Sequence, residues 1–404
     1  MDVIVAGGGI VGTLLGVALA QSGLRVTVCD ALPEATRRAA DFDGRAYAVA
    51  AAGQRMLATL GLWNSLAPHA QAMTDIRVSD GRPGEDPAPP LLHFDHRETD
   101  GGPFAFMLED RHLRAVLQDA AMATPGLTLR APVRITHHRA ENGAVLVTLA
   151  DGGRLGARLL AACDGRRSAV AARAGLHRTG WDYRQNGLVC ALETEAPHEG
   201  VAQEIFLPAG PFALLPLIGK RVSLVWTESR AEAEAINGLS DGAYLAELRR
   251  RMGERLGAVR LVGRRYTYPL ALSLAPSWIA SRLALVGDSA HAIHPLAGQG
   301  LNLGFKDVAA LAEVVATARR RGEDIGRADV LRRYQQWRRF DTAAMALACD
   351  GFNRLFSNDR RALRGLRRMG LALVDRLPAA KRGFIALAAG QTGVQPRLLR
   401  GLPI

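Results

Sequence analysis

The stretch Asp2-Val3-Ile4-Val5-Ala6-Gly7-Gly8-Gly9-Ile10-Val11-Gly12 decides the fold of this chain. It begins as a short buried strand, and its glycine-rich turn leads into an apolar segment that predicts a helix to about Ser22. A second strand is expected over 25–29, and it closes on Asp30, 18 residues beyond Gly12. Strand, glycine loop, helix, strand and acid together predict a Rossmann-type unit that binds a dinucleotide.

The glycines of this loop have distinct expected roles. Gly7 permits a tight turn, Gly9 lets the backbone approach a pyrophosphate, and Gly12 lets the helix pack closely on the strand. The phosphates are expected at the positive end of the helix, and Asp30 is expected to accept hydrogen bonds from the adenosine ribose. The predicted ligand contacts of this unit are Gly7, Gly9, Ile10, Val11, Gly12, Asp30 and Ala31.

Length and composition indicate an ordinary globular protein. The chain has 404 residues, 48% hydrophobic and 22% charged, which favours two or three structural units. The four cysteines are far apart and form no C-x-x-C pair, which argues against a disulfide framework and a zinc site, and no metal is expected. The sequence shows neither a signal peptide nor an apolar run of about eighteen residues, so we expect a cytoplasmic protein.

The net charge of +12 belongs to the last part of the chain. Residues 1–318 hold 32 Lys+Arg against 32 Asp+Glu, whereas residues 319–404 hold 19 against 7. In the tail, leucines and a glycine recur at steps of three and four, and most arginines lie off that line, which predicts a cationic amphipathic helix. The apolar line is Leu363, Leu366, Gly370, Leu373 and Leu377, and the arginines are Arg360, Arg361, Arg364, Arg367 and Arg368.

Three interpretations of this basic tail stay open. It contacts an anionic membrane surface, which would place the protein peripherally at the inner face of the membrane; it docks a partner of a biosynthetic complex; or it packs on the protein's own body. Nucleic acid is a weaker interpretation, because aromatic residues are scarce near the arginines.

Two further motifs each follow the pattern of a buried strand. Residues 159–163 run into Asp164-Gly165-Arg166-Arg167-Ser168, and residues 283–286 run into Gly287-Asp288. A turn-rich loop, 295–300, then opens a helix expected over about 301–318. Taken singly, Asp164-Gly165 fits an ordinary turn, and Asp288 fits a helix cap.

The three motifs, in this order, resemble the para-hydroxybenzoate-hydroxylase-like (group A) FAD monooxygenases over residues 1–345. The stretch 294–304 with Asp307 looks more narrowly like the signature of the ubiquinone-biosynthesis hydroxylases. The resemblance implies bound FAD, NAD(P)H as a transient reductant, and hydroxylation of a polyprenylated phenol with O2 through a flavin C4a-hydroperoxide. We find no second G-x-G-x-x-G, as suits a family whose flavin swings outward to meet NAD(P)H.

The resemblance also implies which residues contact the flavin. Asp288 matches a ligand of the ribityl hydroxyls, and the helix start after Gly298 offers N–H groups to the negatively charged side of the reduced ring. Asp164 matches a residue with pyrophosphate and NAD(P)H duties, and Val133 one that meets the adenine through its backbone. The further predicted contacts are Arg45, Arg111, Val133, Asp164, Gly287, Asp288, Pro295, Gly298, Gly300, Leu301 and Asn302.

For some of these residues a purely structural interpretation stays open. A solvated surface arginine is an equal interpretation of Arg45, and His291 and His294, without a third ligand, fit packed or loop histidines better than metal ligands. Pro295, Gly298 and Gln299 are expected to position the flavin ring, and no catalytic base is identified, since the cofactor carries the hard step.

The predicted fold is α/β: a Rossmann-type FAD-binding domain with an inserted β-sheet substrate domain and a C-terminal helical tail. The FAD-binding domain is expected over 1–75, 103–180 and 277–345, the substrate domain over 76–102 and 181–276, and the tail over 346–404. A strand is expected over 127–135, and one helix, about 240–256, is expected to interrupt the strands of the insert. The apolar residues of the insert suit a polyprenylated ring, and equally suit sheet core.

The sequence therefore predicts an FAD-dependent aromatic-ring monooxygenase. The alternatives are a hydroxylase of another small aromatic compound, a polyprenyl reductase-like flavoprotein that needs no oxygen, and a noncatalytic accessory flavoprotein.

Overall fold

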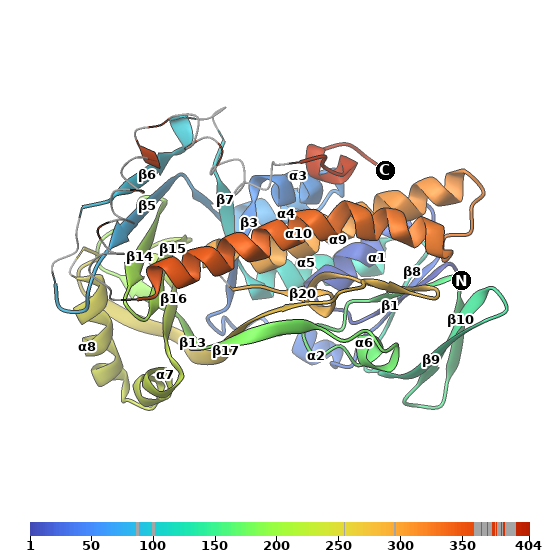
Figure 1. Ribbon diagram of the computed structural model, residues 1–404, viewed down its shortest axis with the longest axis horizontal. Coiled ribbons are helices and arrows are strands. Elements are labelled where there is room, and N and C mark those ends of the chain that lie inside the picture. Colours follow the sequence, from blue (N-terminus) through green and yellow to red (C-terminus); the bar gives the residue numbers. More distant parts are fainter. Residues whose placement is uncertain are drawn as a thin grey trace.

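The computed structural model describes residues 1–85, 89–98, 102–253, 255–294, 296–358 and 393–404, with a few single residues between 365 and 383. Pro295 and nearly all of the amphipathic pattern predicted for the tail lie outside the described residues. Figure 1 shows two sheets side by side, with one long helix, α10 (Ala328–Phe356), crossing in front of them.

A six-stranded sheet forms the core of the N-terminal part. Its order is β18-β19-β12-β1-β2-β8, and its pairs are parallel except β18 with β19. The strands β1, β2 and β12 are buried along their whole length, as their continuous apolar sequences require. The bounds are β1 Val3–Ala6, β2 Val26–Cys29, β8 Leu127–Arg130, β12 Leu159–Ala162, β18 Ile279–Ala280 and β19 Leu283–Leu285.

Helices pack together on this sheet, and a small meander accompanies it. The helix α1 (Ile10–Gln21) lies between α5 (Asp110–Ala123) and α9 (Gln299–Arg320). The meander consists of β9 (Ile135–Glu141), β10 (Ala144–Leu149) and β11 (Arg154–Ala157). The strand expected over 127–135 is divided into β8 and β9, because Pro132 lacks the N–H that a continuous ladder needs.

The parallel arrangement brings the three sequence motifs to one edge. The strands β1, β2, β12 and β19 end at that edge, and each runs directly into one of the predicted ligand-binding segments. In open α/β sheets this carboxyl edge is where ligands bind.

The second sheet has eight strands in the order β20-β17-β13-β16-β15-β14-β5-β6. Two helices, α7 (Arg230–Asn237) and α8 (Asp241–Met252), cover one of its faces. The prediction of only one helix in the insert, over about 240–256, was therefore wrong: α8 corresponds to it, and α7 was not predicted. Ser229 and Ser240 each cap a helix N-terminus, which separates the two helices. The strands are β5 Asp75–Asp80, β6 Leu92–Asp95, β13 Thr179–Thr194, β14 Val201–Leu207, β15 Gly210–Leu217, β16 Arg221–Ser229, β17 Val259–Leu274 and β20 His291–Ala292.

A third, three-stranded sheet, β3-β7-β4, lies between the other two and packs against both. Its strands are β3 Ala46–Ala50, β4 Ala70–Met73 and β7 Ala105–Glu109. The shorter helices are α2 Glu34–Arg37, α3 Ala51–Thr59, α4 Trp63–Leu66, α6 Ala169–Arg173, η1 Ala67–His69, η2 His96–Glu98, η3 Gly287–Ser289, η4 Leu296–Gly298 and η5 Arg397–Arg400.

The helix α10 runs unbroken through residue 346, where the sequence suggested that the tail begins. The end of the chain packs on the protein itself, because Leu398 and Leu399 are buried and Arg55 donates from Nε to the Leu399 carbonyl at 3.0 Å. For residues 393–404 the structure therefore agrees with the third interpretation of the tail. Among the described helices, none has both the length and the apolar character needed to cross a bilayer.

Candidate functional site

The glycine loop after β1 needs glycine for steric reasons at two positions. Gly7 has φ +100°, and a Cβ atom there would lie 2.4 Å from the Cys163 carbonyl oxygen. A Cβ on Gly12 would lie 1.9 Å from the Gly7 carbonyl oxygen. Gly9 differs, since it is exposed and a Cβ there would meet no atom within 4 Å. The loop is thus closed toward the sheet and open on its outer side.

Asp30 is buried at the end of β2 and fixes the same loop. Its Oδ2 accepts from the Gly8 N–H at 2.5 Å, and its Oδ1 accepts from the Leu32 N–H at 2.7 Å. Its carbonyl accepts from the Val133 N–H at 2.7 Å, which places Val133 beside Asp30, and Ala31 is exposed next to them. A carboxylate has four acceptor positions, so Asp30 keeps capacity for a ligand hydroxyl.

Asp164 performs a cap function at the end of β12. Its Oδ1 accepts from the Ser168 hydroxyl at 2.5 Å and its Oδ2 from the Val170 N–H at 3.1 Å, while Ser168 caps α6 by accepting from Ala171. Asp164 therefore stabilises the turn between β12 and α6, as its turn interpretation expects.

Asp288 is exposed on the third motif, whereas its neighbour Gly287 is buried with φ +62°. The Gly287 N–H donates to Oδ2 of Asp307 at 2.9 Å. Asp307, on α9, thus fixes the turn that presents the Asp288 carboxylate to the edge of the sheet.

Asp307 is also the centre of a buried charge cluster. His291 contacts Oδ2 through Nε2 at 2.6 Å, and Arg338 of α10 donates from Nε to Oδ1 at 2.8 Å. Burial alone would raise the pKa of Asp307, but the charges of His291 and Arg338 hold it below its ordinary value. His291 is a packed histidine, as expected. The sequence analysis did not identify Arg338. The signal available was Asp307 itself, because a carboxylate within the apolar helix α9 requires a buried partner of opposite charge.

The start of α9 is held by Asn302. Its Nδ2 donates to the Ala48 carbonyl at 2.9 Å and its Oδ1 accepts from the Ala50 N–H at 2.9 Å, so the side chain ties α9 to β3. The N-cap residue Gly298 has φ +64° and no capping side chain, and in the described part of the chain a Cβ on Gly300 would meet no atom within 4 Å. The helix start is therefore anchored yet open at Gly300, with Leu301 and Gln299 beside it.

Both predicted arginines are engaged in ion pairs. Arg45 contacts Asp43 at 2.7 Å and Asp110 at 3.1 Å, and 45% of its side chain is exposed. Arg111 donates from Nε to Glu109 at 2.7 Å and from Nη1 to the Ala40 carbonyl at 2.8 Å. Arg111 lines a hollow of about 270 Å³ between β7 and β15.

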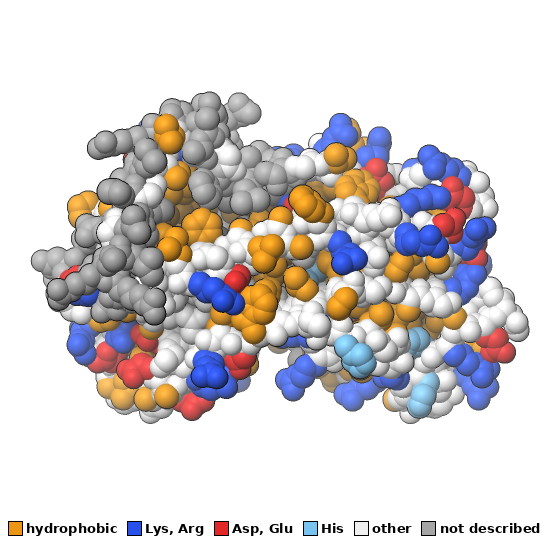
Figure 2. Space-filling view, in the orientation of Figure 1, with side chains coloured by type: hydrophobic (Ala, Val, Ile, Leu, Met, Phe, Trp, Pro, Cys, Tyr) orange, Lys and Arg blue, Asp and Glu red, His pale blue; other side chains and the backbone are white. Residues whose placement is uncertain are grey.

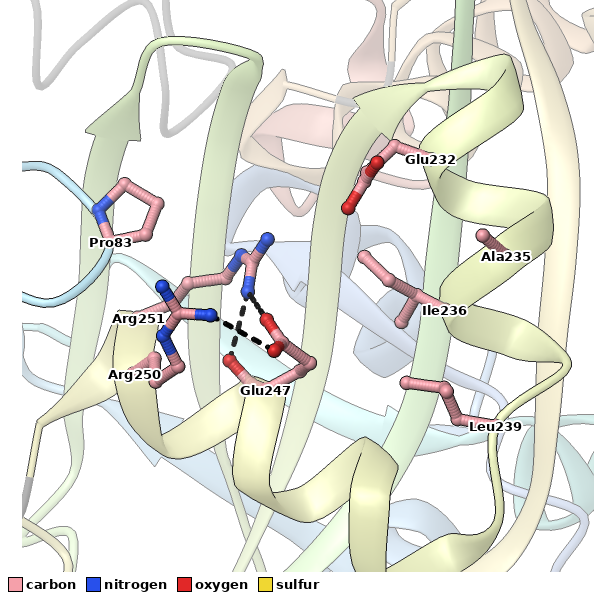
Figure 3. A pocket seen from close by; sticks show the side chains of 8 residues that line it. All are labelled: Pro83, Glu232, Ala235, Ile236, Leu239, Glu247, Arg250 and Arg251. Atoms are coloured by element: carbon pink, nitrogen blue, oxygen red, sulfur yellow. Dashed lines mark hydrogen bonds and ion pairs between the residues drawn. The ribbon is translucent and has the colours of Figure 1, made fainter.

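A second hollow, of about 370 Å³, lies elsewhere. Figure 3 shows Glu247, Arg250 and Arg251 of α8 on one side of it and, on the other, Glu232, Ala235 and Ile236 of α7 with Leu239 just after that helix. Arg251 and Glu247 pair at 2.6 Å, so the charges within it are largely satisfied. It adjoins the face of the substrate sheet turned away from α9, and the three motifs contribute nothing to it.

His294, which precedes η4, is fully buried, and among the described residues neither of its ring nitrogens has a hydrogen-bond partner. Its ring meets Tyr183 edge-on with centroids 5.3 Å apart. Burial lowers the pKa of His294 to about 4, because the charged imidazolium would lose its hydration there.

Comparison with known proteins identifies the family. Residues 1–347 match a family described as FAD binding domain. The chain belongs to this FAD-binding family. It is 43% identical over its full length to the ubiquinone hydroxylase UbiL of Rhodospirillum rubrum, covering 93% of that protein. It is 34% identical to the 3-demethoxyubiquinol 3-hydroxylase of Escherichia coli, over 96% of this chain and 98% of that one.

Solved structures give the same fold. The p-nitrophenol 4-monooxygenase PnpA of Pseudomonas putida superposes with a TM-score of 0.80 at 21% identity, over 97% of this chain and 99% of that one. The architecture is thus that of the para-hydroxybenzoate-hydroxylase-like monooxygenases, a parallel Rossmann sheet beside an antiparallel substrate sheet. The protein is an FAD-dependent monooxygenase, as the sequence predicted.

Proposed function

We propose that this monooxygenase hydroxylates the aromatic ring of a polyprenylated phenol on the pathway to ubiquinone. The 43% identity with a ubiquinone hydroxylase over the whole chain carries the proposal. One atom of O2 enters the ring, the other leaves as water, and NAD(P)H supplies the two electrons. The bound FAD supplies the oxygen-activating chemistry, and the protein binds and orients the reactants.

The residues at the sheet edge fit FAD. Two helices, α1 and α9, begin at this edge without a capping side chain, so their N–H groups are available to negative charge. We assign the pyrophosphate to the start of α1 and the flavin ring to the start of α9. The outer sides of Gly9 and Gly300 are open, which supports close approach of a ligand to both helix starts.

The remaining assignments follow from the same edge. The adenosine end belongs beside Asp30, Ala31 and Val133, and the exposed Asp288 carboxylate would accept hydrogen bonds from the ribityl hydroxyls. Arg45 and Arg111 already pair with the carboxylates of Asp43 and Glu109. Contact with FAD would therefore require each guanidinium to divide its N–H donors between that carboxylate and the cofactor.

A gene deletion tests the pathway. Mass spectrometry of the accumulating quinone precursor should show a missing ring oxygen, and an unaltered quinone would contradict the proposal. With purified FAD-loaded protein, oxygen uptake should match hydroxylated product. A reductase would consume no oxygen, and an accessory flavoprotein would show no substrate-stimulated NAD(P)H oxidation.

We further propose that the protein works in the cytoplasm, in peripheral contact with the inner face of the membrane where its lipid-soluble substrate resides, with the basic tail contributing to that contact. The described part of the chain offers support on α10. Phe340, Leu347 and Leu355 are 84%, 64% and 40% exposed on one side of this helix, and the exposed Arg332 and Arg339 lie alongside. Figure 2 shows hydrophobic side chains gathered over α10. An apolar stripe beside cationic side chains suits an anionic lipid surface.

A further inference from the structure

Three buried polar atoms next to η4 have no hydrogen-bond partner in the described part of the chain. They are both ring nitrogens of His294 and the hydroxyl oxygen of Tyr183, and the two rings are in edge-on contact. Burying a polar group without a partner is unfavourable, so such groups normally hold a bound water or a ligand. The pair of His294 and Tyr183 is therefore incomplete without a further polar partner.

An irregularity in β13 directs Tyr183 toward α10. The pairing of β13 with β17 shifts register between Asp182 and Gln185, so residues 183–184 stand outside the ladder. A bulge of this kind re-aims side chains and is frequent beside active sites. Tyr183 packs into the apolar cluster that contains Cys349 of α10 and Leu296 of η4. The bulge thus brings a hydroxyl group between the substrate sheet, α10 and η4.

Asp350 of α10 lies near both side chains. Burial raises the pKa of Tyr183, and Asp350 raises it further. The same carboxylate opposes burial in its effect on the pKa of His294. A carboxylate acts in this way on both groups only when it is close to them. Three side chains from β13, from α10 and from the residue before η4 to η4's own neighbour thus converge on one buried place.

The Asp350 end of this cluster reaches the surface. Trp181 donates from Nε1 to its Oδ1 at 3.1 Å, and Arg354 pairs with its Oδ2 at 2.9 Å. The Arg354 guanidinium also lies over the Trp181 ring, 5.1 Å from the ring centroid. Trp181 is 41% exposed and the Arg354 side chain 62% exposed, whereas His294 is fully buried. The cluster therefore connects solvent at α10 with the segment that leads into η4.

We propose that Tyr183, Asp350 and His294 bind an ordered water through which a proton passes from solvent toward the start of α9. A buried water makes roughly two to four hydrogen bonds, and the three side chains supply that number. The hydroxylation consumes such a proton: NAD(P)H, O2, the substrate and one proton give NAD(P)+, water and the hydroxylated ring. The inference needs this monooxygenase reaction and not the identity of the phenol.

Proton transfer through this site changes no oxidation state. An O–H bond of the water breaks as an N–H bond forms on one ring nitrogen of His294, and the N–H bond on its other nitrogen breaks toward the start of α9. The water regains its proton from solvent beside Asp350. With a pKa of about 4, roughly one His294 imidazole in 1,000 is protonated at pH 7, so the ring carries the proton only in transit.

The other titratable groups around His294 leave this route to the imidazole. Burial raises the pKa of the Cys349 thiol to about 12, and it also raises the pKa of Tyr183, so both groups keep their protons near neutral pH. The remaining charges, Asp350 and Arg354, are paired with each other. His294 is therefore the group of this cluster that exchanges a proton.

A crystal structure of the FAD-loaded protein tests the water site. We expect an ordered water within about 3.2 Å of the Tyr183 oxygen, of a carboxylate oxygen of Asp350 and of a ring nitrogen of His294. Tyr183→Phe keeps the ring and removes the hydroxyl, and the water should be lost or displaced. The control is Tyr244→Phe, which removes the hydroxyl of another buried tyrosine, on α8 at the opposite face of the substrate sheet, and should keep the water.

The proton route is tested by hydroxylation of 2-prenylphenol with NAD(P)H in H2O and in D2O. Tyr183→Phe and His294→Gln should each lower the rate by about 100-fold, and the ratio of the rate in H2O to that in D2O should rise above that of the parent. Tyr244→Phe should leave both values unchanged. A merely structural role of the two residues would slow the reaction without changing the isotope ratio.

The outcomes separate this inference from the proposed function. Absence of the water in the parent, or parent-like rates in both variants, overturns the inference, and Tyr183→Phe decides alone if His294→Gln folds poorly. If the parent does not hydroxylate 2-prenylphenol, the proposed substrate class fails. The variants are then compared in the reoxidation of the dithionite-reduced protein by O2, which forms hydrogen peroxide and also takes up a proton, because the reduced flavin is anionic. Equal rates and isotope ratios in parent and variants overturn the proton route in that case as well.

Discussion

Val11 of α1 and Gly304 of α9 are in direct contact: a Cβ atom on Gly304 would lie 2.8 Å from Cγ2 of Val11. A Cβ on Gly287 would lie 3.2 Å from the other methyl group of the same valine. The first and third motifs, at opposite ends of the FAD-binding part, are therefore one packed unit. The packing of Val11 against Gly304 and Gly287 therefore sets the distance between the starts of α1 and α9.

Replacing Gly304 by alanine should strain this contact. We expect Gly304→Ala to lower the free energy of unfolding by about 1–3 kcal/mol, because the added methyl group overpacks Val11. Affinity for FAD should fall as well, since the two helix starts move apart. Chemical denaturation of the apoprotein and titration with FAD measure the two effects.

Gly300→Ala is the matched control on the same helix. A Cβ at Gly300 would meet no atom of the described residues within 4 Å, so the stability of the apoprotein should be unchanged or slightly higher. FAD affinity should nevertheless fall if the flavin approaches the backbone there. Unchanged affinity would show that the ring lies elsewhere.

The buried pair of Arg338 and Asp307 should matter more than any exposed pair. Arg338→Met leaves the Asp307 carboxylate buried with one partner fewer, and we expect a loss of about 3–5 kcal/mol in stability. The exposed pair of Arg230 and Asp182 is the control, where Arg230→Met should change stability by less than about 1 kcal/mol. Equal effects in denaturant titrations would contradict the role given to the cluster.

His294 predicts a pH dependence of stability. Its pKa is about 4 in the folded state, against an ordinary 6.5, so between these values the unfolded chain binds a proton that the folded chain does not. Stability contributed by His294 is therefore complete above pH 6.5 and is lost as the pH falls toward 4, by about 3 kcal/mol. Unfolding curves of the parent and His294→Gln across this range should diverge, and parallel curves would refute the assignment.

The stripe on α10 predicts binding to lipid. Phe340→Ser with Leu347→Ser should leave stability nearly unchanged, because both side chains are exposed, and should weaken sedimentation with anionic liposomes at low salt. Met122→Ser, at a side chain 58% exposed on α5, is the control. Point substitutions are preferable to deleting the tail, since removal of the packed Leu398 and Leu399 would itself destabilise the protein. Equal sedimentation of all three proteins would rule out α10 as the contact.

Much of the nucleotide-binding architecture could be predicted because its signals are local. The strand, glycine loop and helix over 2–22 and the helix begun near residue 300 depend on steric needs and apolar patterns that lie within a few residues. That the three motifs lie together could also be predicted, because each follows a strand of one parallel sheet and parallel strands end at the same edge. Which atoms of FAD each residue contacts stays a prediction.

The elements that were missed depend on distant partners. The helix α10 carries Arg338 on its buried side, so its apolar pattern is interrupted where Asp307 supplies the compensating charge. The helix α7 is only eight residues long and follows directly on a strand, too short for a clear period.

The strands β13 and β17 are 16 residues long and pair along their length, and the end of β17 pairs with β20, which contains the buried His291. The insert is therefore not a detachable module, because it shares its backbone hydrogen bonds with the part that holds the cofactor. A chimaera designed to accept a different aromatic compound would have to keep both strands in register and exchange only the residues between them. Recombination at the apparent domain boundaries, residues 180 and 277, would cut through this shared ribbon or its immediate flank.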